Sequence, residues 1–179
     1  RQNQSCSKVC CGIASKEAIE IRKMLPECRV FVFYIDMRMY GFWEDEIYWK
    51  AQEEYKINFI RGIVTEITRR GDQVVVKGED TTMGRPLEAP MDVVILSVGM
   101  EPSEGTTQMA KMFNLPFESH GYIESIGGAL NTVVTPVTGI FVAGAAGGPA
   151  DLEDSVSMGG AAAMKASAFL RKASLKVAA

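Results

Sequence analysis

The sequence has little histidine and no long apolar run. Among 179 residues the one histidine, His120, lies in a Glu-Ser-His-Gly stretch typical of a surface turn, and no base–nucleophile pair of the triad kind is present. No apolar run approaches the ~20 residues that a membrane helix needs, and the first residues do not form a secretory signal. We therefore expect a cytoplasmic protein, or one on the cytoplasmic face of a membrane-bound complex, with no direct membrane insertion.

Basic clusters are also missing. The 19 Lys and Arg residues are scattered, and the formal net charge is −3, so nothing indicates nucleic-acid binding. Hydrophobic residues make up 47% of the chain and charged residues 23%, so it can bury a core. The length suffices for one domain or for two incomplete ones. Because the chain opens at Arg1 and not at a methionine, we expect a piece of something longer.

Helical patterns alternate with buried-strand patterns, which predicts an α/β fold. Ser15 is expected to cap the first helix, and Pro26 to stop it. The expected helices span residues 16–25 and 44–55. A third is expected to begin at Ser103 or Thr106 and to end near residue 113, and a fourth to begin near Asp151 or Asp154 and to end near residue 172. The expected strands are 29–35, 57–60, 63–69, 73–77, 92–97 and 139–143, with a hairpin turn at 70–72 and a polar loop at 81–90.

Three of the four cysteines, Cys6, Cys10 and Cys11, lie close together. Thiolates hold iron in iron–sulfur clusters, usually four per cubane cluster. Zinc binding and core or redox-active cysteines are alternatives that the pattern leaves open. The fourth cysteine, Cys28, lies at the entrance to a predicted strand, and we interpret it as a core residue. A cubane cluster would therefore need a ligand from before Arg1.

A second candidate site follows the predicted strand 139–143. That strand runs into a Gly-rich turn at 144–149, and a helix of small residues comes next. Free N–H groups and the helix dipole at such a helix start attract anions. A tight strand-to-helix connection has the same pattern, so both readings stay open. Asp151 either contacts a ligand or caps the helix.

Taken in order, these segments resemble the HdrA family, the flavoprotein subunits of heterodisulfide reductases, together with their relatives in quinone-interacting oxidoreductase (Qmo) complexes. The Cys6-x3-Cys10-Cys11 motif is the most specific element. The resemblance covers residues 6–171 and also rests on segments 34–38, 79–81, 92–102, 138–144 and 148–151.

The resemblance implies a partial thioredoxin-reductase-like fold with two dinucleotide-binding domains. Residues 1–100 would hold the iron–sulfur segment and part of the pyridine-nucleotide-type domain, and residues 101–179 the C-terminal part of the FAD-binding domain. No GxGxxG turn for the FAD pyrophosphate occurs in the sequence. We therefore expect a C-terminal fragment, or one subunit of a split protein, whose partner is the rest of the flavoprotein.

The family also implies an oxidoreductase subunit that passes electrons between FAD and a [4Fe-4S] cluster. It would work with other redox subunits in anaerobic sulfur, sulfate or methanogenic energy metabolism. Cys6, Cys10 and Cys11 are the implied cluster ligands, and Lys16 is the implied cation beside the flavin. The implied FAD-binding residues are Gly99, Gly144, Ala145, Ala146, Gly148, Pro149, Asp151, Ser155 and Val156.

Two alternatives remain. An NAD(P)H-dependent FAD disulfide or ferredoxin reductase of the same fold would need a second Gly-rich nucleotide site, which the sequence lacks. A zinc-stabilised binding module without redox activity would use the cysteines differently. Ala145 is a departure, because related flavoproteins often carry an aspartate at this position and the HdrA subunit often carries a cysteine.

Overall fold

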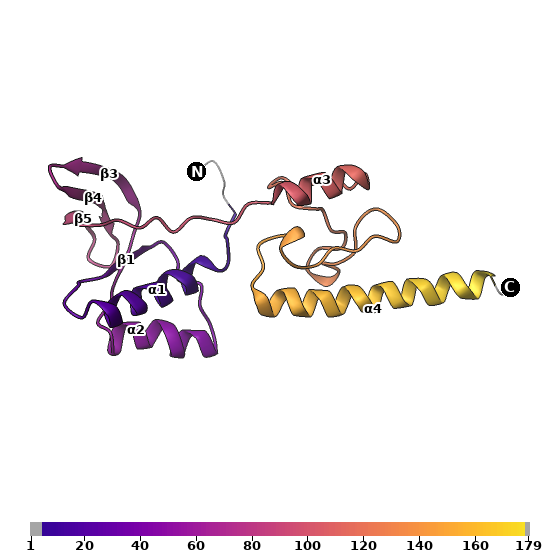
Figure 1. The fold of residues 1–179 in the computed structure, drawn as a ribbon, viewed down its shortest axis with the longest axis horizontal. Helices are drawn as coiled ribbons and strands as arrows, with labels where there is room; N and C mark the ends of the chain where they lie inside the picture. The colour runs from indigo at the N-terminus through magenta and orange to yellow at the C-terminus, as the bar shows by residue number, and fades with distance from the viewer. Residues whose placement is uncertain (1–4, 178–179) are drawn as a thin grey trace. The chain divides into compact units, whose positions relative to one another are not determined.

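The chain folds into two compact units. A computed structural model describes residues 5–177 and, apart from residues 129 and 173–177, their side chains. One unit is Cys10–Val98, and the other combines Arg1–Val9 with Gly99–Ala179. Helices occur together with parallel and antiparallel strands (Figure 1), so the chain has the mixed α/β class that the sequence predicts.

The first half of the Cys10–Val98 unit is a parallel strand pair covered by helices. Strands β1 and β2 pair in parallel, with Phe31 opposite Asn58. Residues from the helices and from the start of β2 form its core, namely Ala18, Ile19, Ala51 and Ile57. The elements are α1 (Cys10–Met24), β1 (Phe31–Tyr34), the π-helical segment η1 (Glu44–Trp49), α2 (Lys50–Glu53) and β2 (Asn58–Arg61).

Three expectations for this region were wrong. Ser15 does not cap α1, because the helix already begins at Cys10, and the Ser15 side chain is fully buried inside it. Strand β1 is shorter than predicted and half-buried along its length, since it has one neighbouring strand among the described residues instead of two. Cys28 is likewise only partly buried, so it is not the core residue that we expected.

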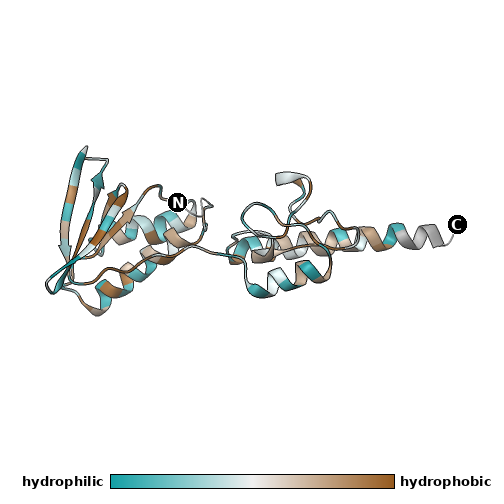
Figure 2. Cartoon of the chain, turned by 90° about the horizontal axis from the view of Figure 1, so that it is seen from above, coloured by the Kyte–Doolittle hydropathy of each residue, from teal (hydrophilic) through white to brown (hydrophobic). Residues whose placement is uncertain are grey.

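The second half of this unit is an antiparallel sheet of β3 (Val64–Arg70), β4 (Gln73–Asp80) and β5 (Arg85–Met91). The predicted hairpin turn is confirmed, because Arg70 pairs with Gln73. Hydrophilic and hydrophobic residues both occur along the strands (Figure 2), and Val75 and Val76 of β4 are buried.

The expected polar loop at 81–90 is instead a turn followed by β5. The Asp80 carboxylate accepts from the amides of Thr82 and Met83, and Asp80 then pairs with Arg85. Prolines within a strand usually argue against such an assignment. They are tolerated because β5 lies at the edge of its sheet, where a missing N–H leaves no strand unpaired.

The predicted buried strand at 92–97 does not form. Within residues 5–177 no strand pairs with this segment, and its apolar side chains are exposed, with Val93 at 74% and Leu96 at 67%. A continuous apolar run becomes a buried strand only when neighbouring strands and helices cover both of its faces. Those neighbours are not provided by the described residues.

The other unit packs helices around short irregular segments. Helix α3 (Glu104–Met112) is confirmed, and the Ser103 hydroxyl caps it by accepting from the Thr106 amide at 3.2 Å. The long C-terminal helix is also confirmed, as α4 (Leu152–Val177). Two short 3-10 turns, η2 (Gly128–Leu130) and η3 (Gly144–Ala146), lie between these helices. The core of this unit consists of Ala110, Leu115, Ile123 and Val142.

The expected strand at 139–143 is reduced to one bridge, between Val134 and Phe141. Buried polar groups hold this region in place of a ladder. The Thr135 hydroxyl lies within hydrogen-bonding distance of two carbonyls, those of Val137 at 3.1 Å and Ile140 at 2.9 Å. A buried hydroxyl with carbonyl partners fixes an irregular segment that has few strand hydrogen bonds.

No helix within residues 5–177 has both the length and the apolar character that crossing a membrane requires.

Gly62 is expected to be essential for the stability of the Cys10–Val98 unit. A Cβ atom at this position would collide with the backbone carbonyl of Glu79. We expect Gly62→Ala to lower the free energy of unfolding by about 1–3 kcal/mol in urea titrations. In the control Gly12→Ala the new Cβ meets no atom within 4 Å in α1, so this variant should be at least as stable as the wild type. Equal stability of Gly62→Ala and wild type would contradict this packing.

Tyr122 should make the stability of its unit sensitive to high pH. Its hydroxyl donates to the Met100 carbonyl at 3.0 Å, and burial, with smaller effects from Glu101 and Glu118, raises its pKa above the usual 10.0. Because its pKa is higher in the folded than in the unfolded protein, neutral Tyr122 stabilises the fold, and this stabilisation is fully present below the unfolded-state pKa. It is lost as the pH rises through the folded-state pKa. Urea unfolding measured at pH values between about 8 and about 12 should therefore show that the free energy of unfolding falls more steeply with pH for wild type than for Tyr122→Phe.

Candidate functional site

The segment that carries Cys6 forms a tight turn. The Lys8 amide donates to the Cys6 sulfur at 3.3 Å, and the Val9 amide donates to the Ser7 carbonyl at 2.7 Å. Lys8 has a φ of 63°, in the left-handed region that residues other than glycine seldom adopt. Cys6 itself is exposed.

Ser7 anchors this turn to the residue after Gly99. Its hydroxyl accepts from the Met100 amide at 3.0 Å, and a Cβ at Gly99 would lie only 2.9 Å from the same oxygen. Glycine at position 99 thus leaves room for Ser7. Gly99 was predicted to contact FAD, and the structure gives it this packing role.

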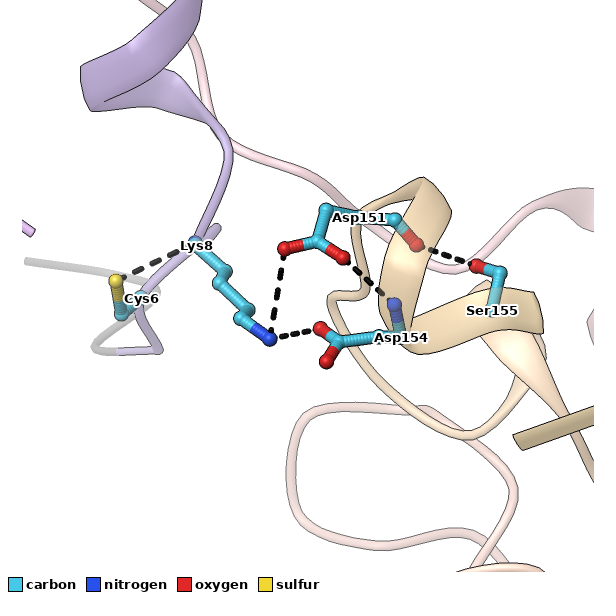
Figure 3. A network of polar contacts seen from close by, with 5 residues as sticks. All are labelled: Cys6, Lys8, Asp151, Asp154 and Ser155. Atoms are coloured by element: carbon cyan, nitrogen blue, oxygen red, sulfur yellow. Dashed lines mark hydrogen bonds and ion pairs between the residues drawn. The ribbon is translucent and has the colours of Figure 1, made fainter. Parts of the chain in front are cut away.

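Asp151 caps helix α4. Its carboxylate accepts from the Asp154 amide at 2.8 Å, and its carbonyl accepts from the amide and the hydroxyl of Ser155 at 3.0 and 2.7 Å. Figure 3 shows these contacts around the first turn of the helix. The two readings of Asp151 left open by the sequence are therefore not exclusive, because a capping carboxylate lies at the helix end where an anion would bind.

The Lys8 ammonium joins the two regions. It pairs with the Asp154 carboxylate and lies 3.6 Å from the Asp151 carboxylate (Figure 3). These three side chains are each about one-third exposed, with values of 33% for Lys8, 38% for Asp151 and 35% for Asp154. The segment that carries Cys6 is thus held against the start of α4.

The Gly-rich turn presents backbone amides close by. Gly144 has a φ of 63°, and a Cβ there would press on the Ser155 hydroxyl at 3.3 Å. The Gly147 amide donates to the Gly144 carbonyl at 3.0 Å and closes the 3-10 turn η3, to which Ala145 and Ala146 belong. Open N–H groups at the start of a helical turn can bind an anion.

Cys11 lies in the first turn of α1, and its sulfur contacts the loop after β1. It accepts from the Arg38 amide at 3.5 Å and lies 3.7 Å from the Asp36 carbonyl. Arg61 at the end of β2 holds this loop, because its guanidinium bonds the Ile35 carbonyl and the Asp36 carboxylate, each at 3.2 Å. Two of the three predicted cluster ligands, Cys6 and Cys11, thus each accept a backbone N–H.

The structure brings some predicted site residues together and leaves others apart. Gly144, Asp151 and Ser155 meet at the start of α4. Ala145, Ala146, Gly148 and Pro149 belong to the same turn, and Gly148 has open space where a Cβ would stand. Val156 is 69% exposed.

Cys10 and Lys16 lie on α1, where Lys16 is exposed. In residues 5–177 no three His, Cys, Asp or Glu side chains are gathered as a metal site.

Sequence reasoning missed Ser7 and Lys8, which stand between the first two clustered cysteines. Nothing in the local pattern marks a lysine whose partner lies 146 residues further along the chain. The only available signal was the positive charge between Cys6 and Cys10 together with the carboxylates of Asp151 and Asp154 at the predicted helix start.

Comparison with known proteins gives relatives of one kind. No protein-family model matches the chain. It is 39% identical over 169 residues to the HdrA subunit of a ferredoxin:CoB-CoM heterodisulfide reductase from Methanosarcina acetivorans, covering 94% of this chain and 21% of that protein. It is 37% identical over 172 residues to the iron–sulfur HdrA subunit of a CoB–CoM heterodisulfide reductase from Methanopyrus kandleri, covering 95% and 26%.

An HdrA-like heterodisulfide reductase protein from Archaeoglobus profundus is 34% identical over 173 residues, covering 96% of this chain and 24% of its own length. The site thus belongs to a mixed α/β protein related to redox subunits. The chain is similar over nearly its whole length to A subunits of heterodisulfide reductases, and it spans about a quarter of the length of the curated relatives that it matches.

Removing the cap of α4 should destabilise the unit that combines Arg1–Val9 with Gly99–Ala179. Asp151→Ala loses the acceptor for the Asp154 amide and one ion-pair partner of Lys8. We expect it to lower the free energy of unfolding by about 1 kcal/mol. Asp151→Asn keeps a capping oxygen and should lose less than half as much. Circular dichroism during urea unfolding measures both, and equal losses would show that capping is not what Asp151 contributes.

Proposed function

We propose that this chain is part of an FAD- and [4Fe-4S]-dependent electron-transfer subunit of a heterodisulfide-reductase-like complex. The observation that carries this proposal is the sequence similarity to HdrA proteins, which extends over 94–96% of this chain. Its partners are then the rest of the flavoprotein and other redox subunits of a heterodisulfide-reductase-like or Qmo-like complex. A cytoplasmic location is part of the same proposal.

The proposed fold is a partial thioredoxin-reductase-like one. Residues 1–100 are assigned to the iron–sulfur segment and a pyridine-nucleotide-type domain, and residues 101–179 to the C-terminal part of an FAD-binding domain. A parallel strand pair with helices against it in the Cys10–Val98 unit supports the first assignment. A glycine turn leading into a capped helix supports the second.

The residues around η3 and α4 fit an anionic, phosphate-bearing cofactor such as FAD. The Gly144 backbone adopts a conformation that favours glycine, and Gly148 leaves space for close approach; Ala145 and Ala146 of the same turn are proposed contacts. Asp151 and Ser155 order the first turn of the helix, so that its positive dipole end is fixed in direction. Gly99, Pro149 and Val156 remain proposed contacts.

The cysteines fit iron–sulfur ligation by their chemistry. The sulfurs of Cys6 and Cys11 each accept one amide N–H, which stabilises a thiolate and tunes a bound cluster. Cys10 adjoins Cys11 at the start of α1. Among residues 5–177 these cysteines are not gathered with a third ligand into a metal site.

When bound, a flavin takes up two electrons and can release them singly, whereas a cluster carries one at a time. The contribution of this chain is to bind and orient. The start of α4 places fixed positive dipoles where an anion binds, and Ser7 and Lys8 hold the Cys6 segment against the same helix. Lys16 is proposed to add a positive charge that favours a reduced, anionic flavin.

Metal and flavin analysis of the complete, anaerobically purified subunit tests the proposal. We expect FAD, and iron that falls by about four atoms per subunit in Cys10→Ser and Cys11→Ser. The matched control is Cys28→Ser, whose sulfur lies near the Arg29 carbonyl in another segment, and it should keep all of its iron.

Other measured contents of flavin, iron and zinc would favour one of the two alternative functions. FAD with unchanged iron in both cysteine variants would favour the NAD(P)H-dependent FAD disulfide or ferredoxin reductase. Zinc without iron or flavin would favour the zinc-stabilised binding module and would overturn the redox proposal.

A further inference from the structure

Lys8 is the positive charge that joins the Cys6 segment to the start of α4. Its ammonium faces two carboxylates, those of Asp154 and Asp151, and only about one-third of each side chain is exposed. The pairing joins residues 146 positions apart in the sequence (Figure 3). A partly buried ion pair between distant segments is a stronger constraint than an exposed pair between neighbours on one helix.

The backbone of the turn directs Lys8 to this position. Lys8 adopts a φ of 63°, and its amide is held by the Cys6 sulfur, while the Ser7 hydroxyl accepts from the Met100 amide. An uncommon backbone conformation persists only where surrounding contacts over-determine it. Here those contacts fix the Cys6 sulfur and the Lys8 side chain together.

The charges at this place oppose the binding of an anion unless they are compensated. The helix N-terminus attracts negative charge, but Asp151 and Asp154 already place two carboxylates in its first turn. Lys8 supplies one positive charge against these two. Without it, an anionic ligand at the Gly-rich turn would meet both carboxylates uncompensated.

We propose that Lys8 is a positioning residue with two roles: it fixes the Cys6 segment against α4, and it compensates the Asp151 and Asp154 carboxylates so that the helix start accepts FAD and its reduced, anionic form. This inference rests on the proposed function, because FAD is the anion concerned. The charge role and the tethering role are separable. When Lys8 is replaced by a neutral residue, neutralising Asp154 as well restores the charge balance but does not restore the ion pair that holds the Cys6 segment.

Four variants of the complete subunit separate the roles. They are Lys8→Gln, Asp154→Asn, the double variant Lys8→Gln/Asp154→Asn, and Lys8→Arg, with Lys111→Gln as a control that removes an exposed lysine from α3. Asp154→Asn leaves the cap intact, because Asp154 contributes its backbone amide to the cap and not its side chain.

The flavin midpoint potential, measured by spectroelectrochemistry, reports the charge. We expect the potential to fall in Lys8→Gln, to rise in Asp154→Asn and to return close to wild type in the double variant, with Lys8→Arg and Lys111→Gln unchanged. FAD binding should be weakened roughly two- to five-fold in Lys8→Gln. Identical potentials in Lys8→Gln, Asp154→Asn and wild type, with FAD bound, would overturn the charge role.

Amide hydrogen exchange at residues 5–9, measured without FAD, reports the tether. We expect faster exchange in Lys8→Gln and in the double variant, and wild-type exchange in Lys8→Arg. Unchanged exchange in Lys8→Gln would overturn the tethering role. A wild-type subunit that contains no FAD would overturn the proposed function and the charge role with it, whereas the exchange result would still decide the tether.

Discussion

The anchoring of residues 7 and 8 is the constraint that joins the two parts of one unit, Arg1–Val9 and Gly99–Ala179. Bringing residues 7 and 8 beside Met100 and the start of α4 closes a very long loop, which has an entropic cost that grows slowly with length. Ser7 offsets this cost with a hydrogen bond to the Met100 amide, and Lys8 with two carboxylates. Gly99 permits the close approach, since any side chain there would crowd Ser7.

Asp151 shows how structural and electrostatic demands meet at one residue. As a cap it satisfies the Asp154 amide and stabilises α4. Its negative charge also opposes any anion that approaches the same helix end. A cap without charge would avoid this conflict, but it would give Lys8 one carboxylate fewer to bind. The ion pair with Lys8 therefore offsets part of this negative charge while the cap stays in place.

Local signals predicted what local interactions determine. Helix α3, helix α4 and the hairpin turn at 70–72 were predicted from local sequence patterns, because each depends on neighbours in sequence. The strand β5 was missed because proline tolerance depends on an edge position. The apolar run at 92–97 was misassigned, since burial depends on neighbouring strands. Within the candidate site, the Gly-rich turn was predictable and the role of Lys8 was not.

Backbone amides donate hydrogen bonds to the sulfurs of Cys6 and Cys11. Cys6 accepts from the Lys8 amide and Cys11 from the Arg38 amide. An amide donor is neutral and does not titrate, so it lowers the electron density on sulfur equally at every physiological pH. Its direction depends on the loop that carries it. At Cys11 the Arg61 guanidinium fixes that loop, and at Cys6 the side chains of Ser7 and Lys8 do so. In both places a side chain positions the amide that donates to the sulfur without contacting the sulfur itself.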